Sequence, residues 1–331
     1  MLEHGGRLSA AMARFGGVPA QWVDLSTGVN PYPYPVPAID PGCWQHLPDD
    51  DTALHAAAAA YYGSAELLAV AGSQAAIQAL PALVGGERVG LLAPSYAEHA
   101  HAWRHHRPER FTVDRLDAAV ARLDTLVLVN PNNPTGERLS TEQLLDWHTR
   151  LGRRGGTLVV DEAFADTDPA DSLAAHVGVP GLVVLRSLGK FFGLAGARVG
   201  FILAEPALRT RLAEHLGPWT VAGPAQAVAT AALADTAWQQ AMRPRLVTAA
   251  AQLRAVLEGH GARPRGSSPL FHWIPCAQAR AWQTHLAQAA LWVRAFDTPP
   301  ALRFGLPPDA AALARLDAAL AAGRAAGLCL T

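Results

Sequence analysis

The chain has 331 residues, half of them apolar, and a formal net charge of −1. That length allows one large domain or two linked ones, and the near-zero charge argues against nucleic acid or an anionic membrane surface as a partner. Three widely spaced cysteines (Cys43, Cys276 and Cys329) indicate neither a disulfide framework nor a zinc site. The sequence has neither the apolar core of a signal peptide nor an apolar run long enough to span a membrane, so we expect a cytoplasmic protein.

The first part of the chain is rich in proline and glycine. In VNPYPYPVP these residues favour turns, so the first ~50 residues are expected to wrap over the surface rather than to form a core. Farther along, β-branched runs alternate with helical patterns, which predicts a mostly parallel sheet covered on both faces. The candidate strands are residues 88–93, 125–130, 157–163, 182–188 and 198–204.

A helix is predicted over the stretch STEQLLDWHTRLG, between the second and third of these strands. Ser140 and Gln143 have the spacing of an N-terminal capping box, and Gly152 suits the C-cap.

The pattern changes after about residue 206. Two long helical stretches are predicted over 223–235 and 237–259, and the tail adds short strands in SPLFHWI, LWVRAF and LRFGL. We therefore predict an α/β fold of two domains: a large domain over residues 50–236, and a smaller α+β domain made of residues 1–49 and 237–331.

Polar residues follow the predicted strands at the edge where sheets of this kind bind ligands. The loop NPNNPTG follows one strand, Asp161 ends the next, and Ser187 and Lys190 end the one after. An amide, a carboxylate and a lysine amine are the groups needed to hold pyridoxal 5′-phosphate (PLP), because the lysine forms a Schiff base and the carboxylate keeps the pyridine nitrogen protonated. This hypothesis also explains why a lysine stands among small and apolar residues, where an unused charge would be costly.

The phosphate of such a cofactor needs donors of its own. Gly72 and Ser73 begin a predicted helix, whose first N–H groups attract an anion. Ser187 adds a hydroxyl, and Arg198 adds a guanidinium suited to phosphate oxygens. Taken singly, each of these residues has an ordinary explanation as a cap, a turn or a helix start. Their order at successive strand ends favours a cofactor site.

With these motifs the chain resembles the fold-type I PLP enzymes, the aspartate aminotransferase superfamily, over nearly its whole length. NPNNPTG, DEAF, SLGK and GARVG stand in the family's order. The resemblance implies that Lys190 is the Schiff-base lysine, Asp161 the partner of the pyridine nitrogen and Asn133 a donor to the ring oxygen. It also implies that Tyr96 stacks on the cofactor and that Arg303 binds the substrate's α-carboxylate.

A narrower resemblance comes from both ends of the chain. HGGRLSAAMARFGG, DLSTGVNPYPYP, LWVRAF and LRFGLP are similar to stretches of the threonine-phosphate decarboxylases of cobalamin biosynthesis, relatives of the histidinol-phosphate aminotransferases. This resemblance implies a lyase that converts L-threonine O-3-phosphate to (R)-1-aminopropan-2-yl phosphate. It further implies a homodimer with an isologous interface, because the family's active sites lie at a subunit boundary.

The same resemblance extends the substrate site to His4, Gly28 and Asn30. Arg294 and Arg303 stand on adjacent predicted strands, where Arg294 would bind the substrate's phosphate or, alternatively, pair with a surface carboxylate.

Two other functions stay open. One is transamination of histidinol phosphate, or of another amino acid, on the same scaffold, since fold alone does not settle the reaction. The alternative from another class is a protein that only binds or senses, and the intact pair of Lys190 and Asp161 argues for catalysis instead.

Three positions depart from the family pattern. Phe164 stands where many relatives have a tyrosine that donates to the ring oxygen, and Leu47 where a tyrosine reaches the phosphate of a neighbouring subunit. Gly189 replaces a frequent serine just before the lysine. What replaces the two tyrosines is left open.

The histidines of EHAHAWRHHRPER invite a metal hypothesis. Because no acidic or cysteine partner has suitable spacing, we expect the solvated face of a surface helix and predict no metal site. These histidines are His99, His101, His105 and His106. The roles of His4 and His272 are undecided at this point, each being a site candidate or a structural histidine.

Overall fold

The computed structural model describes residues 4–266 and 268–330, and the chain divides into two compact units. The large unit comprises residues 33–133 and 138–240. The small unit comprises the described residues of 1–32, 134–137 and 241–331. The sequence-based division differs from this one mainly in residues 33–49, which belong to the large unit by their contacts.

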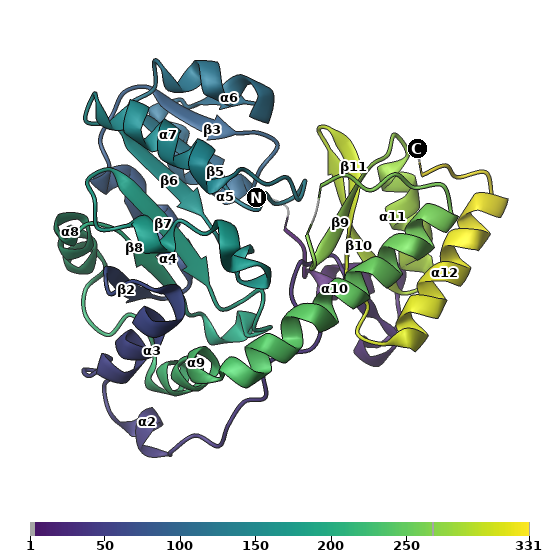
Figure 1. Ribbon diagram of the computed structural model, residues 1–331. Helices are drawn as coiled ribbons and strands as arrows, with labels where there is room; N and C mark the ends of the chain where they lie inside the picture. Colours follow the sequence, from purple (N-terminus) through teal and green to yellow (C-terminus); the bar gives the residue numbers. More distant parts are fainter. Residues whose placement is uncertain (1–3, 267, 331) are drawn as a thin grey trace. The chain divides into compact units, whose positions relative to one another are not determined.

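The large unit is built on a mostly parallel sheet, as predicted (Figure 1). In the described part of the chain its order is β2-β8-β7-β6-β5-β3-β4, and β8 alone runs opposite to the other strands. The strands are β2 (Leu67–Val70), β3 (Val89–Leu92), β4 (Glu109–Phe111), β5 (Thr125–Val129), β6 (Thr157–Asp161), β7 (Leu182–Ser187) and β8 (Gly200–Leu203). The short strands β2 and β4 are absent from the sequence-based prediction.

Helices cover both faces of this sheet. Val127, Val159 and Val183 pack in one core with residues of α4 and α8, and the alternate residues of these strands are buried toward the other face, where α7 contacts β6. The helices of the large unit are α2 (Gly42–Gln45), α3 (Thr52–Tyr62), α4 (Ser73–Leu83), α5 (Ala97–Ala102), α6 (Val113–Val120), α7 (Thr141–Gly152), α8 (Pro206–Leu216), α9 (Gly223–Ala234) and the first residues of α10 (Thr236–Gly259).

The two ends of α7 test the capping prediction. Ser140 Oγ accepts a hydrogen bond from the backbone N–H of Gln143 at 3.2 Å, as expected of an N-cap. At the other end the prediction is wrong, because Gly152 is the last helical residue and Arg153 is the C-cap. The glycine that takes a positive φ (68°) is Gly155, in the turn that leads into β6.

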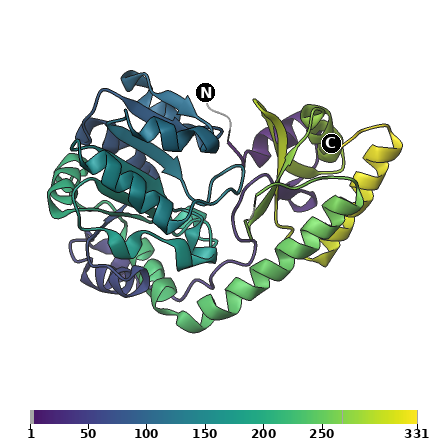
Figure 2. The ribbon, with the colours of Figure 1, turned by 45° about the horizontal axis from the view of Figure 1, so that its top comes forward.

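The small unit contains a four-stranded sheet in its described residues, in the order β1-β10-β11-β9. β1 runs parallel to β10, and the other neighbours are antiparallel. Its elements are α1 (Leu8–Phe15), β1 (Val23–Leu25), β9 (Phe271–Pro275), α11 (Ala279–Gln288), β10 (Leu291–Asp297), β11 (Pro300–Gly305), α12 (Ala310–Ala325) and the rest of α10. Figure 2 shows α10 and α12 side by side. His260, just beyond the end of α10, has its Nε2 2.6 Å from the carboxylate of Asp317 on α12.

The N-terminal arm corrects one expectation. Residues 1–49 were expected to lie over the surface, but Leu25 and Ser26 are fully buried and Trp22 packs with Ala11 and Ala287. β1 has only three residues, too few to show an alternating pattern in the sequence, and it is held by its pairing with β10. Within the described residues, no helix has the length and apolar character needed to cross a bilayer.

Candidate active site

The start of α4 lies against two residues that follow β7. Gly72 has a φ of 71°, and a Cβ added to it would meet Arg198 Nη2 at 2.6 Å, so the guanidinium rests directly on this glycine. A Cβ on Gly200 would overlap the backbone nitrogen of Ser73, which means that β8 approaches the helix start as closely as two backbones can. Ser187 is the register partner of Gly200, so the predicted phosphate donors lie together.

This cluster fits a phosphate by its charge. The first turn of α4 carries no acidic side chain, and the N-terminal end of a helix is itself positive. Arg198 places a second positive group at the same end and is exposed. Two positive groups held together in this way are stabilised by an anion bound between them.

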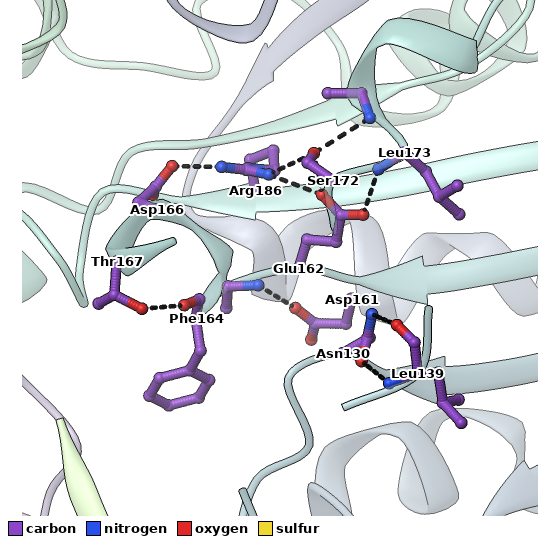
Figure 3. Close-up of polar contacts among 12 residues, drawn as sticks. Asn130, Leu139, Asp161, Glu162, Phe164, Asp166, Thr167, Ser172, Leu173 and Arg186 are labelled. Carbon is purple, nitrogen blue, oxygen red and sulfur yellow. Dashed lines mark hydrogen bonds and ion pairs between the residues drawn. The ribbon is translucent and has the colours of Figure 1, made fainter. Parts of the chain in front are cut away.

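Asp161 lies at the end of β6, where both carboxylate oxygens are engaged. Oδ1 accepts a hydrogen bond from the backbone N–H of Ala163 at 3.0 Å (Figure 3), and Oδ2 lies 2.9 Å from Nε2 of His99. Asp161 is 3% and His99 4% exposed, so the imidazole N–H is the donor to a buried carboxylate. A carboxylate held from two sides keeps one orientation.

His99 is the site residue that the sequence reasoning missed. It was predicted to lie on a solvated helix face, which is wrong for His99, although His101 and His105 are exposed as expected. α5 spans only six residues before a 3₁₀ turn begins at Trp103, so the stretch is too short to reveal which side is buried. The available signal was the spacing Tyr96-x-x-His99, which places both rings on one side of the turn, with centroids 6.1 Å apart.

Lys190 lies three residues beyond β7 and is half-buried. Its Nζ is 5.6 Å from the centre of the Phe164 ring, so the phenylalanine that replaces the family's tyrosine packs beside this amine. The backbone N–H of Gly189 donates to Ser187 Oγ at 3.2 Å. A Cβ on Gly189 would lie 3.3 Å from Ala195 Cα, which leaves little room for the serine that relatives carry.

The loop NPNNPTG is fixed by its first two asparagines. Asn130 bridges to the backbone of Leu139 through both side-chain atoms, at 3.0 and 2.9 Å. Asn132 accepts from Ser95 Oγ at 2.8 Å and donates to the carbonyl of Pro94 at 2.9 Å, which ties the loop to the segment before Tyr96. Asn133, the next residue of the loop, is half-buried. Tyr96, at the N-cap of α5, is half-buried as well.

The two arginines of the tail lie next to each other in the small unit. Arg294 on β10 and Arg303 on β11 are direct register partners, so their side chains share one face of the sheet. Arg303 is 6% exposed, donates to the carbonyl of Ser26 at 2.6 Å and lies over the ring of Phe271 at 5.3 Å. Arg294 is half-buried and lies over the ring of Phe296 at 5.1 Å.

Ser26 connects Arg303 to the N-terminal segment. The N–H of Gly6 donates to Ser26 Oγ at 2.7 Å, which brings the half-buried His4, two residues earlier, into the same part of the small unit. Gly28 and Asn30 follow and are buried. Asn30 accepts from the N–H of Tyr32 at 2.8 Å.

His272 has a structural environment on β9. Its Nε2 lies 2.8 Å from the carbonyl of Ala250 on α10, and the side chain is buried. Burial lowers the pKa of His272 below its ordinary value. A neutral, hydrogen-bonded histidine of this kind serves packing between a helix and a strand.

The chain is similar to several known proteins. The profile of the family "Aminotransferase class I and II" matches residues 40–319. A threonine-phosphate decarboxylase of Pseudomonas aeruginosa is 52% identical over 322 residues, which cover 97% of each chain. A threonine-phosphate decarboxylase of a Sinorhizobium species is 42% identical over 331 residues, covering 97% of this chain and 98% of the relative.

The fold is found in solved structures as well. The histidinol-phosphate aminotransferase of Sinorhizobium meliloti, solved in complex with pyridoxal-5′-phosphate, superposes with a TM-score of 0.82 at 22% identity, covering 96% of this chain and 94% of that one. This similarity confirms the predicted fold-type I architecture. The chain belongs to the aminotransferase class I and II family.

Proposed function

We propose that the protein is a PLP-dependent threonine-phosphate decarboxylase, which converts L-threonine O-3-phosphate to (R)-1-aminopropan-2-yl phosphate for cobalamin biosynthesis. The observation that carries this proposal is the 52% identity, over 97% of both chains, to a protein of that name. The aminotransferase alternative rests on more distant likenesses, such as 34% identity over 275 residues, 71% of this chain, to a histidinol-phosphate aminotransferase. The paired guanidinium groups of Arg294 and Arg303 support a substrate with two anionic ends.

The large unit would hold the cofactor. Lys190 would bind its aldehyde through Nζ, and Asp161, held by His99, would accept a hydrogen bond from the protonated ring nitrogen. Tyr96 would stack on the ring, and Asn133 would donate to the ring oxygen. The phosphate would take the place that the start of α4 leaves for an anion, with donors from Gly72, Ser73, Ser187 and Arg198.

PLP, when bound, withdraws electrons from a bond to the substrate's α-carbon. Which bond reacts depends on how the substrate is turned, because only a bond perpendicular to the ring plane overlaps its π system. The residues that bind the anionic ends therefore select the reaction. Arg303 would bind the α-carboxylate and Arg294 the phosphate of the substrate, while Lys190 Nζ would hold the proton that the α-carbon takes up after carbon dioxide leaves.

A direct assay tests the choice between the two reactions. The purified protein, supplied with PLP, is incubated with L-threonine O-3-phosphate in the absence of any keto acid, and carbon dioxide is measured. We expect release of carbon dioxide. Faster transfer of the amino group from histidinol phosphate to 2-oxoglutarate would overturn the decarboxylase assignment in favour of an aminotransferase.

The proposal includes a homodimer in the cytoplasm. Large apolar side chains are exposed on the large unit, among them Val36, Trp44, Leu47 and Trp219, whose exposed fractions range from 52% to 72%. Burying such side chains against a second copy would remove apolar surface from water. Sedimentation equilibrium is expected to give twice the chain's mass, and a monomer at micromolar concentration would refute the dimer.

A further inference from the structure

A buried ionic cluster lies directly beside the residues of the candidate site. Arg186 Nη1 is 2.6 Å from the Glu162 carboxylate and donates to Ser172 Oγ at 2.9 Å, while Nη2 contacts the Asp166 carboxylate (Figure 3). Glu162 also accepts from Ser172 Oγ at 2.5 Å and from the backbone N–H of Leu173 at 2.7 Å. The side chains of Arg186, Glu162 and Asp166 are no more than 1% exposed.

The electrostatics of the cluster depend on Arg186. Burial alone would lower the pKa of Arg186, but the charges of Asp166 and Glu162 outweigh it and raise the pKa. Burial raises the pKa of Glu162, against the opposing effect of Arg186. Without the guanidinium, two carboxylates would be left buried together, so Arg186 holds both in place.

The cluster lies on the opposite face of the sheet from Asp161. Asp161 is the register partner of Leu185, so Glu162 and Arg186, one residue farther along each strand, point to the other face. There Arg186 lies over the ring of Tyr62, the last residue of α3, at 4.7 Å. The same two strand ends thus carry predicted site residues on one face and the ionic cluster on the other.

The cluster also reaches the segment beside Lys190. Asp166 lies in a 3₁₀ turn (Ala165–Thr167) that begins one residue after Phe164. Thr167 Oγ1 donates to the carbonyl of Phe164 at 3.1 Å, and the Phe164 ring lies beside Lys190 Nζ. A guanidinium that fixes Asp166 therefore fixes this turn and the ring that packs on the lysine.

We propose that Arg186 is a positioning residue for the cofactor site. By binding Glu162 and Asp166 at once, it holds the ends of β6 and β7 and the turn after Phe164. Asp161 and Lys190 are thereby kept in their positions. This inference rests on the proposed function, because Asp161 and Lys190 are held in place to bind PLP. A lysine cannot replace Arg186 fully, because its single ammonium lacks the forked donors that reach both carboxylates.

Three variants separate positioning from stability. Arg186→Met removes the guanidinium, and Arg186→Lys keeps one charge. The triple variant Arg186→Met, Glu162→Gln, Asp166→Asn leaves no charge buried in the cluster, which relieves the electrostatic penalty of the single change. Arg209→Met is the matched control, because Arg209 pairs with Glu66 and with the carbonyl of Ala204 in the same unit, away from the site residues.

The first measurement is the affinity of the apoprotein for PLP, read from the cofactor's absorbance. We expect Kd to rise about tenfold or more in Arg186→Met and in the triple variant, less in Arg186→Lys, and to stay near the wild-type value in Arg209→Met. Wild-type affinity in the triple variant would overturn the inference. If the wild-type protein itself did not bind PLP, the proposed function would fail, and the second measurement would still test Arg186.

The second measurement is amide hydrogen exchange of the apoproteins. We expect faster exchange confined to residues 161–167 and 187–190 in the triple variant, with β3 and β5 unchanged. A uniform increase over the whole sheet would show that Arg186 contributes only to global stability and would overturn the positioning role. The Arg209→Met control is expected to leave exchange at residues 161–167 unchanged.

Discussion

The two sheets of the molecule carry functional residues in different ways. In the large unit the parallel strands β5, β6 and β7 end at one edge, so residues distant in the sequence meet there: Asp161 at the end of one strand, Ser187 at the end of the next. In the small unit the antiparallel strands β10 and β11 place Arg294 directly opposite Arg303, as the end pair of their ladder. The first arrangement brings together chemically different side chains, and the second places two guanidinium groups next to each other.

This difference suggests a division of labour. Chemically different groups at the edge of the sheet can hold a cofactor, and every substrate of the enzyme has to react with that cofactor. A pair of guanidinium groups can bind only the anionic ends of a particular substrate. Changes in the large unit should therefore reduce all reactions alike, and changes at the arginine pair should alter the preference between substrates.

The largest expected effect is that of Lys190→Ala. Loss of the amine removes the covalent link to PLP and the group that holds a proton, so we expect activity to fall by about 10²- to 10⁴-fold on every substrate. The check is borohydride reduction followed by mass spectrometry, which should attach PLP to Lys190 in the wild-type protein only. A variant that still forms a reducible link would remove Lys190 from this role.

Asp161→Ala should come next. A neighbouring carboxylate raises the pKa of a titrating nitrogen by roughly one to three units, so its loss should lower kcat about 10- to 1000-fold on threonine phosphate and on threonine alike. His99→Phe, which leaves the carboxylate with one fewer donor, should cost less, about tenfold. Steady-state kinetics on cofactor-saturated protein measure both, and normal turnover in Asp161→Ala would refute the assignment.

Arg294→Ala sharpens the comparison. If this guanidinium binds the phosphate of the substrate, its loss should reduce kcat/KM for threonine phosphate about 10- to 100-fold more than for unphosphorylated threonine. Equal losses on both substrates would exclude Arg294 from the phosphate site and would favour the alternative that it pairs with a surface carboxylate.

His272→Gln should have the smallest effect, and only on stability. The pKa of His272 is lowered in the folded protein by burial, and Arg254 lowers it further while Glu258 opposes. The unfolded chain, with an ordinary value of about 6.5, therefore binds the proton more readily, and the free energy of unfolding falls as the pH drops through that value. Denaturant unfolding between about pH 7.5 and 5.5 should show a smaller loss in the variant, with unchanged substrate preference.

The sequence predicted the central strands of the large unit and much less of its surroundings. The five candidate strands are rich in Val and Leu and buried on both faces, so their pattern was clear, and the positions of Asp161 and Lys190 followed from where they end. β1, β2 and β4 have three or four residues and are edge strands, each held by pairing with one strand from another part of the chain, which no local pattern reveals.

The same limit applies within the site: features set by neighbouring segments could be predicted, and contacts between residues far apart in the sequence could not. The adjacency of Arg294 and Arg303 was expected from two neighbouring strands and is confirmed by their register. The burial of His99 against Asp161 depends on residues 62 positions apart, and so does not show in a stretch that otherwise reads as polar. The ionic cluster of Arg186, Glu162 and Asp166 was not predicted for the same reason, because each of these charged residues is ordinary in its own stretch of sequence.

The reversed direction of β8 has a consequence for how the chain can vary. Because β8 starts at the edge where β7 ends, residues 188–199 leave and re-enter the sheet at one place, closed by the hydrogen bond from the N–H of Leu188 to the carbonyl of Val199 at 3.1 Å. Lys190 and Arg198 lie near the two ends of this loop, and we call the 3₁₀ turn between them, Ala195–Ala197 with its exposed Gly196, the tip. A change of length at the tip would lengthen a loop already closed at its base, whereas a change next to either strand would displace a functional side chain. Natural or engineered length variation in this segment should therefore be confined to the tip.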